Sequence, residues 1–286
     1  MSCGASSMNS HKPSISAVVI ARNEESNIAA CLETLLWCDE IVVVDMESED
    51  RTVEITRKFT DRIYSHPKVT VFDIAKKYAV EQATGEWILL IDADEMIPRT
   101  LSEELRRKSL DEQNSIVEIP FRHYILGDCA EYTGWGFTPL PRFFRKGAVC
   151  FTGVVHAYMC PTEGAKVIRL DQIPEYCIIH FNYRDSTQFI EKLNRYTSIE
   201  AEHLVSSDKV FSCRRLIFDS LREFYRRYLP GCGYREGVRG FSLAVLMAFY
   251  RALTWIKVWE TYTYRDDPVA ERYNRLRDRI LREWHI

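Results

Sequence analysis

Residues 87–95 read Trp-Ile-Leu-Leu-Ile-Asp-Ala-Asp-Glu, and this stretch decides the fold class. Its five leading apolar residues predict a strand that is buried on both faces. Asp92 and Asp94 follow at the carboxyl end of that strand, and Glu95 comes next. Ligands of open α/β sheets bind beyond such strand ends, where clustered carboxylates suit Mg²⁺ or Mn²⁺ carrying a phosphorylated substrate. The alternative for this segment alone is a strand end with a solvated acidic turn.

Upstream, residues 15–21 and 41–44 are apolar runs that predict two further buried strands. Helical spacing of apolar residues follows each of them, a third strand is expected near 69–72, and 76–84 is expected to be helical. This alternation predicts an α/β fold, a mostly parallel sheet with helices on both faces. Because Asp45 and Asp92 end two of its strands at the same edge, we expect a binding crevice there.

The pattern changes after residue 115. Short strand-like pieces are expected at 116–119, 142–144, 154–159, 166–170 and 176–181, with glycines between them. Thr100 and Glu103 form a capping-box pattern, and Asp185 is expected to cap a long helix. We therefore expect a disordered tail over 1–13, a catalytic domain over 14–185 and a helical region over 186–286.

Composition restricts the function classes. The 286 residues carry a net charge of -3, which argues against a general nucleic-acid binder. Nine scattered cysteines without a CxxC pair favour reduced cytoplasmic thiols over a zinc site or a disulfide framework. The N-terminal segment lacks the apolar core of a signal peptide. No run is expected to reach the ~18 to 20 apolar residues that span a bilayer.

Several stretches, in order, resemble family 2 glycosyltransferases of the GT-A (Rossmann-like) fold, and most closely the bacterial branch that adds a sugar to lipopolysaccharide core. The resemblance covers roughly residues 14–260. The matching stretches are 21–25, 39–45, 48–52, 81–87, 92–95, Gly134-Trp135, 142–145, Val155-His156, His180 and 189–196.

The resemblance implies a metal-dependent, inverting transfer from a nucleotide-diphosphate sugar, with a uridine diphosphate hexose as the expected donor. It places the nucleotide base and ribose at the first strand end and at Asp45, and the metal and diphosphate at the DxD motif. The implied donor-binding residues are Arg22, Asn23, Glu24, Asp45, Asp50, Lys76, Asp92 and Asp94, and the implied ligands of Mn²⁺ or Mg²⁺ are Asp92, Asp94 and His180. A helix N-cap is the alternative for Asp50, a solvated helix face for Lys76, and a structural role for His180.

The sequence departs from the family where a catalytic base is expected. Ala157 stands where the family carries a Glu after Val-His, and Thr138 stands in place of a common Asp. The remaining candidates for the base are Asp128, Glu131, His156 and Glu163, of which His156 is closest in sequence to the expected position. The absence of both expected acids leaves open a non-catalytic or weakly active protein that binds a nucleotide sugar.

A phosphatase that uses the first Asp of DxD as nucleophile is a further alternative, but there the motif follows the first strand, and here about three strands precede it. The implied acceptor is a glycan or a lipid-linked glycan, with no nucleic acid as partner. Residues 241–259 are largely apolar, and basic residues precede them, namely Arg222, Arg226, Arg227, Arg235 and Arg239. We expect a cytoplasmic protein held peripherally on the inner face of the cytoplasmic membrane, with a helix packed on the catalytic domain as the alternative.

Overall fold

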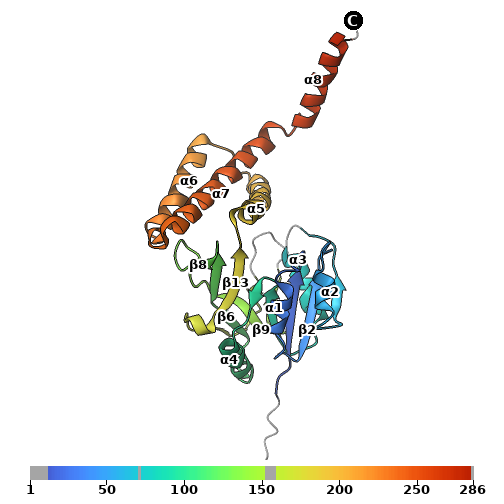
Figure 1. Ribbon diagram of the computed structural model, residues 1–286, viewed down its shortest axis with the longest axis vertical. Coiled ribbons are helices and arrows are strands. Elements are labelled where there is room, and N and C mark those ends of the chain that lie inside the picture. Colours follow the sequence, from blue (N-terminus) through green and yellow to red (C-terminus); the bar gives the residue numbers. More distant parts are fainter. Residues whose placement is uncertain (1–11, 70–71, 152–158, 285–286) are drawn as a thin grey trace, which may run out of the picture. The chain divides into compact units, whose positions relative to one another are not determined.

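This computed structural model describes residues 12–69, 72–151 and 159–284. The chain divides into two compact units (Figure 1). Unit 1 ends at Asn182 and lacks only the short segment Tyr132–Gly134, which belongs to unit 2 together with the chain from Tyr183 onward. The unit boundary at 182/183 lies close to the boundary expected at 185/186.

Unit 1 is built on a seven-stranded sheet with the order β12-β6-β9-β4-β1-β2-β3. Its strands are β1 (Ile15–Ala21), β2 (Glu40–Asp45), β3 (Ile63–Ser65), β4 (Trp87–Asp92), β6 (Ile116–Ile119), β9 (Leu140–Arg145) and β12 (Val167–Arg169). β4, β1, β2 and β3 pair in parallel, whereas β9 runs antiparallel to both β4 and β6. The expected mostly parallel sheet is therefore present, with one reversed strand inside it.

Helices cover both faces of this sheet. On one face α1 (Ile28–Glu33) and α4 (Arg99–Ser109) pack against alternate residues of β1 and β4. On the other face α3 (Phe72–Gln82) packs against the remaining residues of β1, β2 and β4. α2 (Thr52–Thr56) follows β2 and adds Ile55 to the first of these two cores. Central strands covered on both sides explain why their sequences read as continuous apolar runs.

A smaller sheet with the order β5-β13-β7-β8 completes unit 1. Its strands are β5 (Glu95–Met96), β7 (Phe121–Ile125), β8 (Asp128–Cys129) and β13 (Ile178–Tyr183). The remaining elements of the unit are the pair β10 (Val149–Cys150) and β11 (Cys160–Pro161) and the 3-10 helix η1 (Pro174–Tyr176). Because β5 begins three residues after β4 ends, the small sheet starts at the edge where the DxD motif lies.

Two local expectations are wrong. The third strand is β3, at Ile63–Ser65, whereas Val69 lies in no strand and Phe72 begins α3; residues 70 and 71 lie outside the described residues. Thr100 does not cap α4: its hydroxyl donates to the carbonyl of Glu175 (2.8 Å), and Glu103 pairs with Arg99 instead. The strand expected over 154–159 lies largely outside the described residues.

Unit 2 is helical. It contains α5 (Ser186–Ser206), α6 (Cys213–Tyr228), the 3-10 helix η2 (Gly233–Glu236), α7 (Gly237–Thr263) and α8 (Val269–Trp284). Asp185 caps α5 as expected, since its carboxylate accepts from the Gln188 N–H (2.8 Å). α7 packs against both α5 and α6, and Gly240 allows η2 to fold back, because a Cβ there would lie 1.9 Å from the Gly233 carbonyl oxygen.

Polar contacts fix α7 against its neighbours. Lys257 donates to the Asn194 side-chain oxygen (2.7 Å), to Thr197 and to other acceptors of α5, while the Trp255 indole donates to Asp219 of α6 (3.0 Å). By length and composition, the helical span Gly233–Thr263 is nevertheless apolar enough to cross a membrane: an 18-residue window within it has a mean hydropathy of 1.4, and only 28% of that window is buried. The expectation that no segment reaches that length is therefore wrong, because the few charges of α7 are too sparse to lower its average.

Part of the basic segment expected to face a membrane is structural. Arg227 is buried, where it donates to Glu223 (2.6 Å) and to the carbonyl of Thr133 (2.5 Å). Arg226 bonds the same Glu223 (2.8 Å), and Arg239 lies 3.5 Å from Glu236. Charge reversal at Arg227 would therefore disrupt the packing of unit 2 and would not report on a surface role.

Candidate active site

The two acidic strand ends lie at one edge of the sheet, as expected. β1 separates β2 from β4, and the register pairs Ala21 with Asp45 on one side and Ile20 with Asp92 on the other. Neighbouring strands are about 4.8 Å apart, so the backbones of the two strand ends stand roughly 10 Å apart across β1. A nucleoside with its diphosphate is long enough to reach both ends of that edge.

A network of charges surrounds Asp92. One of its oxygens accepts a hydrogen bond from the guanidinium of Arg142 (2.8 Å), and the other lies 3.6 Å from the ammonium of Lys76. The same guanidinium nitrogen also donates to buried Glu95 (2.9 Å), whose second oxygen accepts from the Asp92 N–H (2.9 Å). Lys76, expected near the donor, thus belongs to the DxD cluster, and Asp92 is already held by two cations.

The electrostatics of the cluster follow from burial and from Arg142. Burial by itself disfavours the charged form of Asp92, but Arg142 and Lys76 hold the pKa of its carboxyl well below the usual range. Burial raises the pKa of Glu95 to about 7, with Asp92 adding to the rise and Arg142 opposing it. The pKa of Arg142 is raised because the neighbouring carboxylates outweigh its own desolvation. Asp92 therefore keeps its negative charge at neutral pH.

Asp94 and His180 come together through the small sheet. β13 pairs antiparallel with β5 so that His180 faces Glu95, and the Phe181 N–H donates to the Asp94 carbonyl (2.9 Å). The His180 Nε2 atom then lies 3.5 Å from an Asp94 carboxylate oxygen. Burial tends to lower the pKa of His180, but the bond to Asp94 and the nearby carboxylates raise it. The three implied metal ligands, Asp92, Asp94 and His180, therefore all lie at this strand end.

The remaining implied donor residues lie in the loops after β1 and β2. Asn23 has φ 54°, a left-handed conformation that asparagine tolerates, and its side-chain oxygen accepts from the Glu49 N–H (2.8 Å). The carboxylate of Asp50 accepts from the N–H groups of Glu25 and Thr52 (both 3.0 Å). Asn23 and Asp50 therefore connect the two loops beside the crevice through hydrogen bonds.

Two buried polar atoms at this edge lack a partner among the described residues. They are the Nε of Arg22, just after β1, and the Oδ1 of Asp45, at the end of β2. The other oxygen of Asp45 accepts from the Ser48 N–H (3.1 Å), and the carboxylate borders a hollow of about 400 Å³ beside β3 and α2. A buried carboxylate oxygen without a partner costs free energy unless a ligand or water satisfies it.

Candidates for the catalytic base are less well defined. His156 lies outside the described residues, and Glu163 and Asp128 are exposed. The Glu131 side chain is 54% exposed, and one of its carboxylate oxygens lies 3.7 Å from the guanidinium of Arg122. The structure brings none of the three described carboxylates into the Asp92 network by a described bond.

Sequence reasoning missed Arg142 and His123. His123 stands beside His180, with ring centroids 5.1 Å apart, and burial together with the charges of His180 and Arg142 lowers its pKa to about 3. Arg142 lies inside one of the stretches that match the family, and its signal was a cation between apolar residues of a strand that ends with a second cation, Arg145. Only the antiparallel insertion of β9 beside β4 explains why that cation reaches Asp92.

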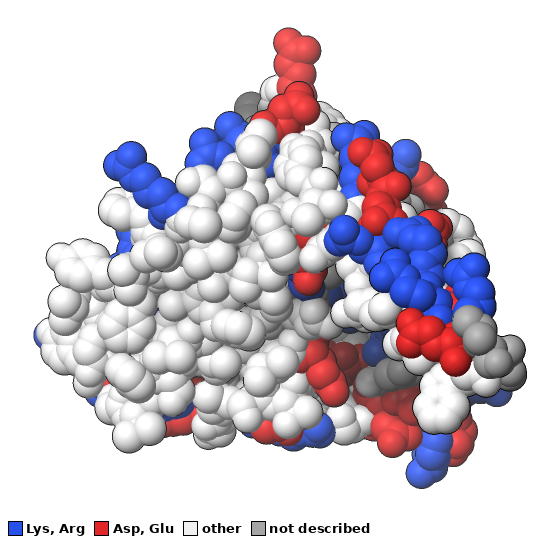
Figure 2. Space-filling view, turned by 90° about the horizontal axis from the view of Figure 1, so that it is seen from above, with Lys and Arg blue, Asp and Glu red and all other residues white. Residues whose placement is uncertain are grey.

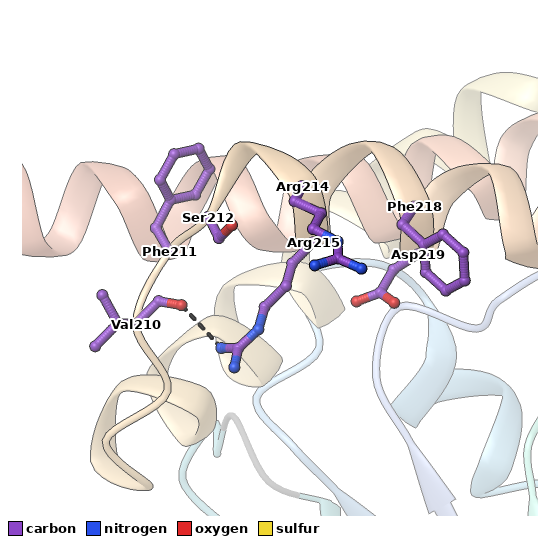
Figure 3. A pocket seen from close by; sticks show the side chains of 7 residues that line it. All are labelled: Val210, Phe211, Ser212, Arg214, Arg215, Phe218 and Asp219. Carbon is purple, nitrogen blue, oxygen red and sulfur yellow. Dashed lines mark hydrogen bonds between the residues drawn. The ribbon is translucent and has the colours of Figure 1, made fainter.

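A second hollow belongs to unit 2. It measures about 520 Å³ and is formed by the loop before α6 and the first turns of that helix (Figure 3). Arg215 crosses it to donate to the Val210 carbonyl (3.0 Å), and Asp219 and Phe218 complete the wall. It shares no residue with the crevice of unit 1.

Comparison with known proteins identifies the class. The family model described as Glycosyl transferase family 2 matches residues 16–162. The lipopolysaccharide core biosynthesis glycosyltransferase LpsC of Rhizobium meliloti is 28% identical over 269 residues, which cover 89% of this chain and 95% of LpsC. An uncharacterized glycosyltransferase of Rickettsia conorii is 24% identical over 270 residues, which cover 91% of this chain and 94% of the Rickettsia protein.

Among solved structures, glucosyl-3-phosphoglycerate synthase from Mycobacterium tuberculosis, in complex with Mg²⁺ and UDP, is 23% identical with a TM-score of 0.33. That match covers 40% of this chain and 44% of the synthase.

This chain therefore belongs to glycosyl transferase family 2, and it is a glycosyltransferase. The resemblance to that family and to its lipopolysaccharide-core relatives is confirmed. The expected GT-A sheet with a helical C-terminal part is confirmed as well, on the family match and on the observed strand order.

Proposed function

We propose that this protein transfers a hexose from a uridine diphosphate sugar to a hydroxyl of a glycan or glycolipid acceptor, with inversion and with the help of Mg²⁺ or Mn²⁺. The observation that carries the proposal is the shared edge of β2 and β4. It presents a buried, unpartnered carboxylate oxygen at Asp45 and a charged cluster at Asp92 and Asp94. The Asp45 end suits a nucleoside, and the end with Asp92 and Asp94 suits a diphosphate with its cation.

The donor set fits a divalent cation. Asp94 and His180 offer a carboxylate and an imidazole 3.5 Å apart, whereas Asp92 is bound by Arg142 and Lys76. No group of three or more His, Cys, Asp or Glu side chains arranged to hold a metal occurs within the described part of the chain. Mg²⁺ typically takes one or two carboxylates and completes its shell with phosphate oxygens and water, so two protein ligands suffice. When bound, the cation would neutralise charge on the leaving diphosphate.

The residues around the cation site have separable roles. Lys76 is half-buried at the same strand end and would add a second positive charge for the diphosphate. Arg142 lies behind Asp92 and keeps it ionised and oriented, so we assign it a positioning role. His156, Glu131 and the other base candidates stay proposals, with the acceptor proton as their target.

A thermal-shift panel of nucleotide sugars, with and without Mn²⁺, tests the proposal directly. A bound donor at about 100 times its Kd stabilises the fold by roughly 2.7 kcal/mol, and this raises Tm by several degrees. We expect the largest shift for a uridine diphosphate hexose in the presence of Mn²⁺. Absence of any shift across the panel would contradict nucleotide-sugar binding. A shift without transfer or hydrolysis of the donor would instead favour the non-catalytic binding protein.

The role of Asp45 gives a separate prediction. Asp45→Asn keeps the size of the side chain and an oxygen for the Ser48 N–H, but it removes the negative charge that faces the hollow. We expect the Kd for UDP to rise at least about tenfold, because a charge-assisted hydrogen bond contributes roughly 1.5–3 kcal/mol. Calorimetry measures the change, and the melting temperature should fall little. UDP binding equal to that of the parent would remove Asp45 from the nucleotide site.

We also propose a location. The relatives of similar length include a lipopolysaccharide core enzyme, and such an acceptor is anchored in lipid. A protein that works on it from the cytoplasm would be held on the inner face of the cytoplasmic membrane. α7 is the one described helix with the length and composition to enter a bilayer.

A further inference from the structure

α6 and α7 expose a large apolar surface. Three α6 side chains are between 57% and 65% exposed, and three on α7 are between 43% and 48% exposed, although all six are large and apolar. We call this surface the apolar face. It consists of Phe218, Leu221 and Tyr225 of α6 and Phe241, Val245 and Phe249 of α7. Contiguous exposed apolar surface of this kind marks an interaction site.

The six side chains form one surface. They recur at three- and four-residue spacing on α6 and at four-residue spacing on α7, which places them along one stripe of each helix. Phe224 and Tyr228 of α6 lie between the stripes, with ring centroids 5.7 and 5.8 Å from that of Phe241. The two stripes therefore meet across an aromatic seam and are not separated by a polar groove.

Basic side chains border the apolar face. Residues 209–240 contain eight Lys and Arg but only three Asp and Glu. Arg215, Arg222 and Arg226 recur at helical spacing beside the α6 stripe, and the side chains of the last two are 65% and 56% exposed. Seen from above, Figure 2 shows a broad area without charged side chains, with most of the blue and red side chains at its borders.

The opposite side of α7 packs against α5 and α6 through polar contacts. Lys257 donates to acceptors of α5, Arg251 pairs with Glu200 (2.6 Å), and the Trp255 indole bonds Asp219. A bilayer-spanning α7 would carry these groups into hydrocarbon or break them, at several kcal/mol for each unsatisfied group. α7 thus presents one face outward while its other face stays packed.

We propose that the apolar face lies in the interface of an anionic phospholipid bilayer, with α6 and α7 parallel to the membrane plane. The aromatic and aliphatic side chains enter the acyl boundary, and the bordering arginines meet the phosphates. A second copy of this chain suits the face less well. A two-fold axis would bring the same basic borders together, and like charges would repel. The inference makes the proposed membrane location specific and does not depend on the transfer chemistry.

Flotation of the full chain with vesicles tests the proposal. One set is phosphatidylcholine alone, and the other contains phosphatidylglycerol as well. We expect flotation with the anionic set, weakened by salt. Phe218→Gln/Leu221→Gln and Val245→Gln/Phe249→Gln should each lower the bound fraction at least about tenfold, because each pair removes large apolar side chains from the contact.

The matched control is Leu36→Gln/Leu110→Gln, two similarly exposed leucines of unit 1, at 56% and 53%. It should float like the parent, and circular dichroism should show all three variants folded, since the changed side chains are exposed. The proposal is overturned if the parent ignores anionic vesicles at low salt, or if both α6 and α7 variants float like the parent. It is also overturned if the variants only convert a lipid-free dimer to a monomer.

Donor hydrolysis in lipid-free buffer separates this inference from the proposed function. Both apolar-face variants should hydrolyse the donor as the parent does. Loss of vesicle binding with intact hydrolysis supports the inference. A parent that floats but neither binds nor cleaves any nucleotide sugar would contradict the proposed function and leave the membrane contact standing.

Discussion

Asp94→Asn is expected to lower kcat at least about 10³-fold while the protein stays folded. Asp94 is the carboxylate that faces His180 (3.5 Å), and the substitution removes its charge without removing a core contact. A bound divalent cation contributes several kcal/mol to stabilising the leaving diphosphate, and each 1.36 kcal/mol is a factor of ten in rate. Donor turnover with a range of Mn²⁺ concentrations measures the effect, and calorimetry of Mn²⁺ with UDP measures the binding.

The control for this variant is Asp171→Asn, which makes the same charge change at an exposed position of unit 1. It should keep parental turnover and parental metal binding. His180→Gln should resemble Asp94→Asn in its metal dependence, because both alter the same pair. If Asp94→Asn binds Mn²⁺ with UDP as tightly as the parent, Asp94 is not a metal ligand.

The strands of the sheet were accessible from the sequence because they are buried on both faces. Residues 15–21 coincide with β1, and 87–91 form all but the last residue of β4. β3 was missed because it is a three-residue edge strand whose side chains are half-buried or exposed, so it carries no continuous apolar run. Periodicity thus locates central strands and fails at the edge.

The site was only partly accessible from the sequence. Asp45 and Asp92 could be placed at one edge because parallel strands share their carboxyl ends. No local pattern places His180 beside Asp94, since that contact depends on β13 pairing with β5, and the expectation came from family resemblance alone. Arg142 depends likewise on the reversed strand β9. Local residue spacing does not predict contacts that depend on long-range antiparallel pairing of strands.

The structure also changes which residues test the membrane hypothesis. The sequence includes Arg226 and Arg227 in the basic segment, and both bond Glu223, but Arg227 is buried whereas the Arg226 side chain is 56% exposed. Helical periodicity shows which side of α6 is apolar, but not which side faces solvent. That distinction requires the position of α7, because α7 covers the side of α6 that contains Phe224.

Arg142→Met is expected to destabilise unit 1 by about 3–5 kcal/mol, because breaking a buried ion pair leaves an uncompensated charge. The Arg142 side chain is 8% exposed, and its guanidinium is bonded to both Asp92 (2.8 Å) and Glu95 (2.9 Å). Methionine fills similar space without the charge, so the loss is electrostatic. Tm should fall by roughly 6–20 °C at about 2–4 °C per kcal/mol. Arg169→Met, which breaks only the exposed pair with Glu118, should cost about 0–1 kcal/mol.

The pH dependence of that loss distinguishes an electrostatic origin from poor packing. Burial raises the pKa values of Asp92 and Glu95, and the positive charge of Arg142 lowers them. Without Arg142, both pKa values therefore rise in the folded state. A carboxyl whose folded pKa lies above its unfolded value loses stability as pH rises through the folded pKa. The deficit of Arg142→Met should therefore grow as pH rises, through Asp92 in the acidic range and through Glu95 above about pH 7, the pKa that its carboxyl already has in the parent. Glu95→Gln in the same background should recover part of it, since one buried charge is gone, with a coupling of about 0.5–3 kcal/mol. Urea unfolding at several pH values measures both effects, and a deficit independent of pH would mean that Arg142 acts through its volume alone.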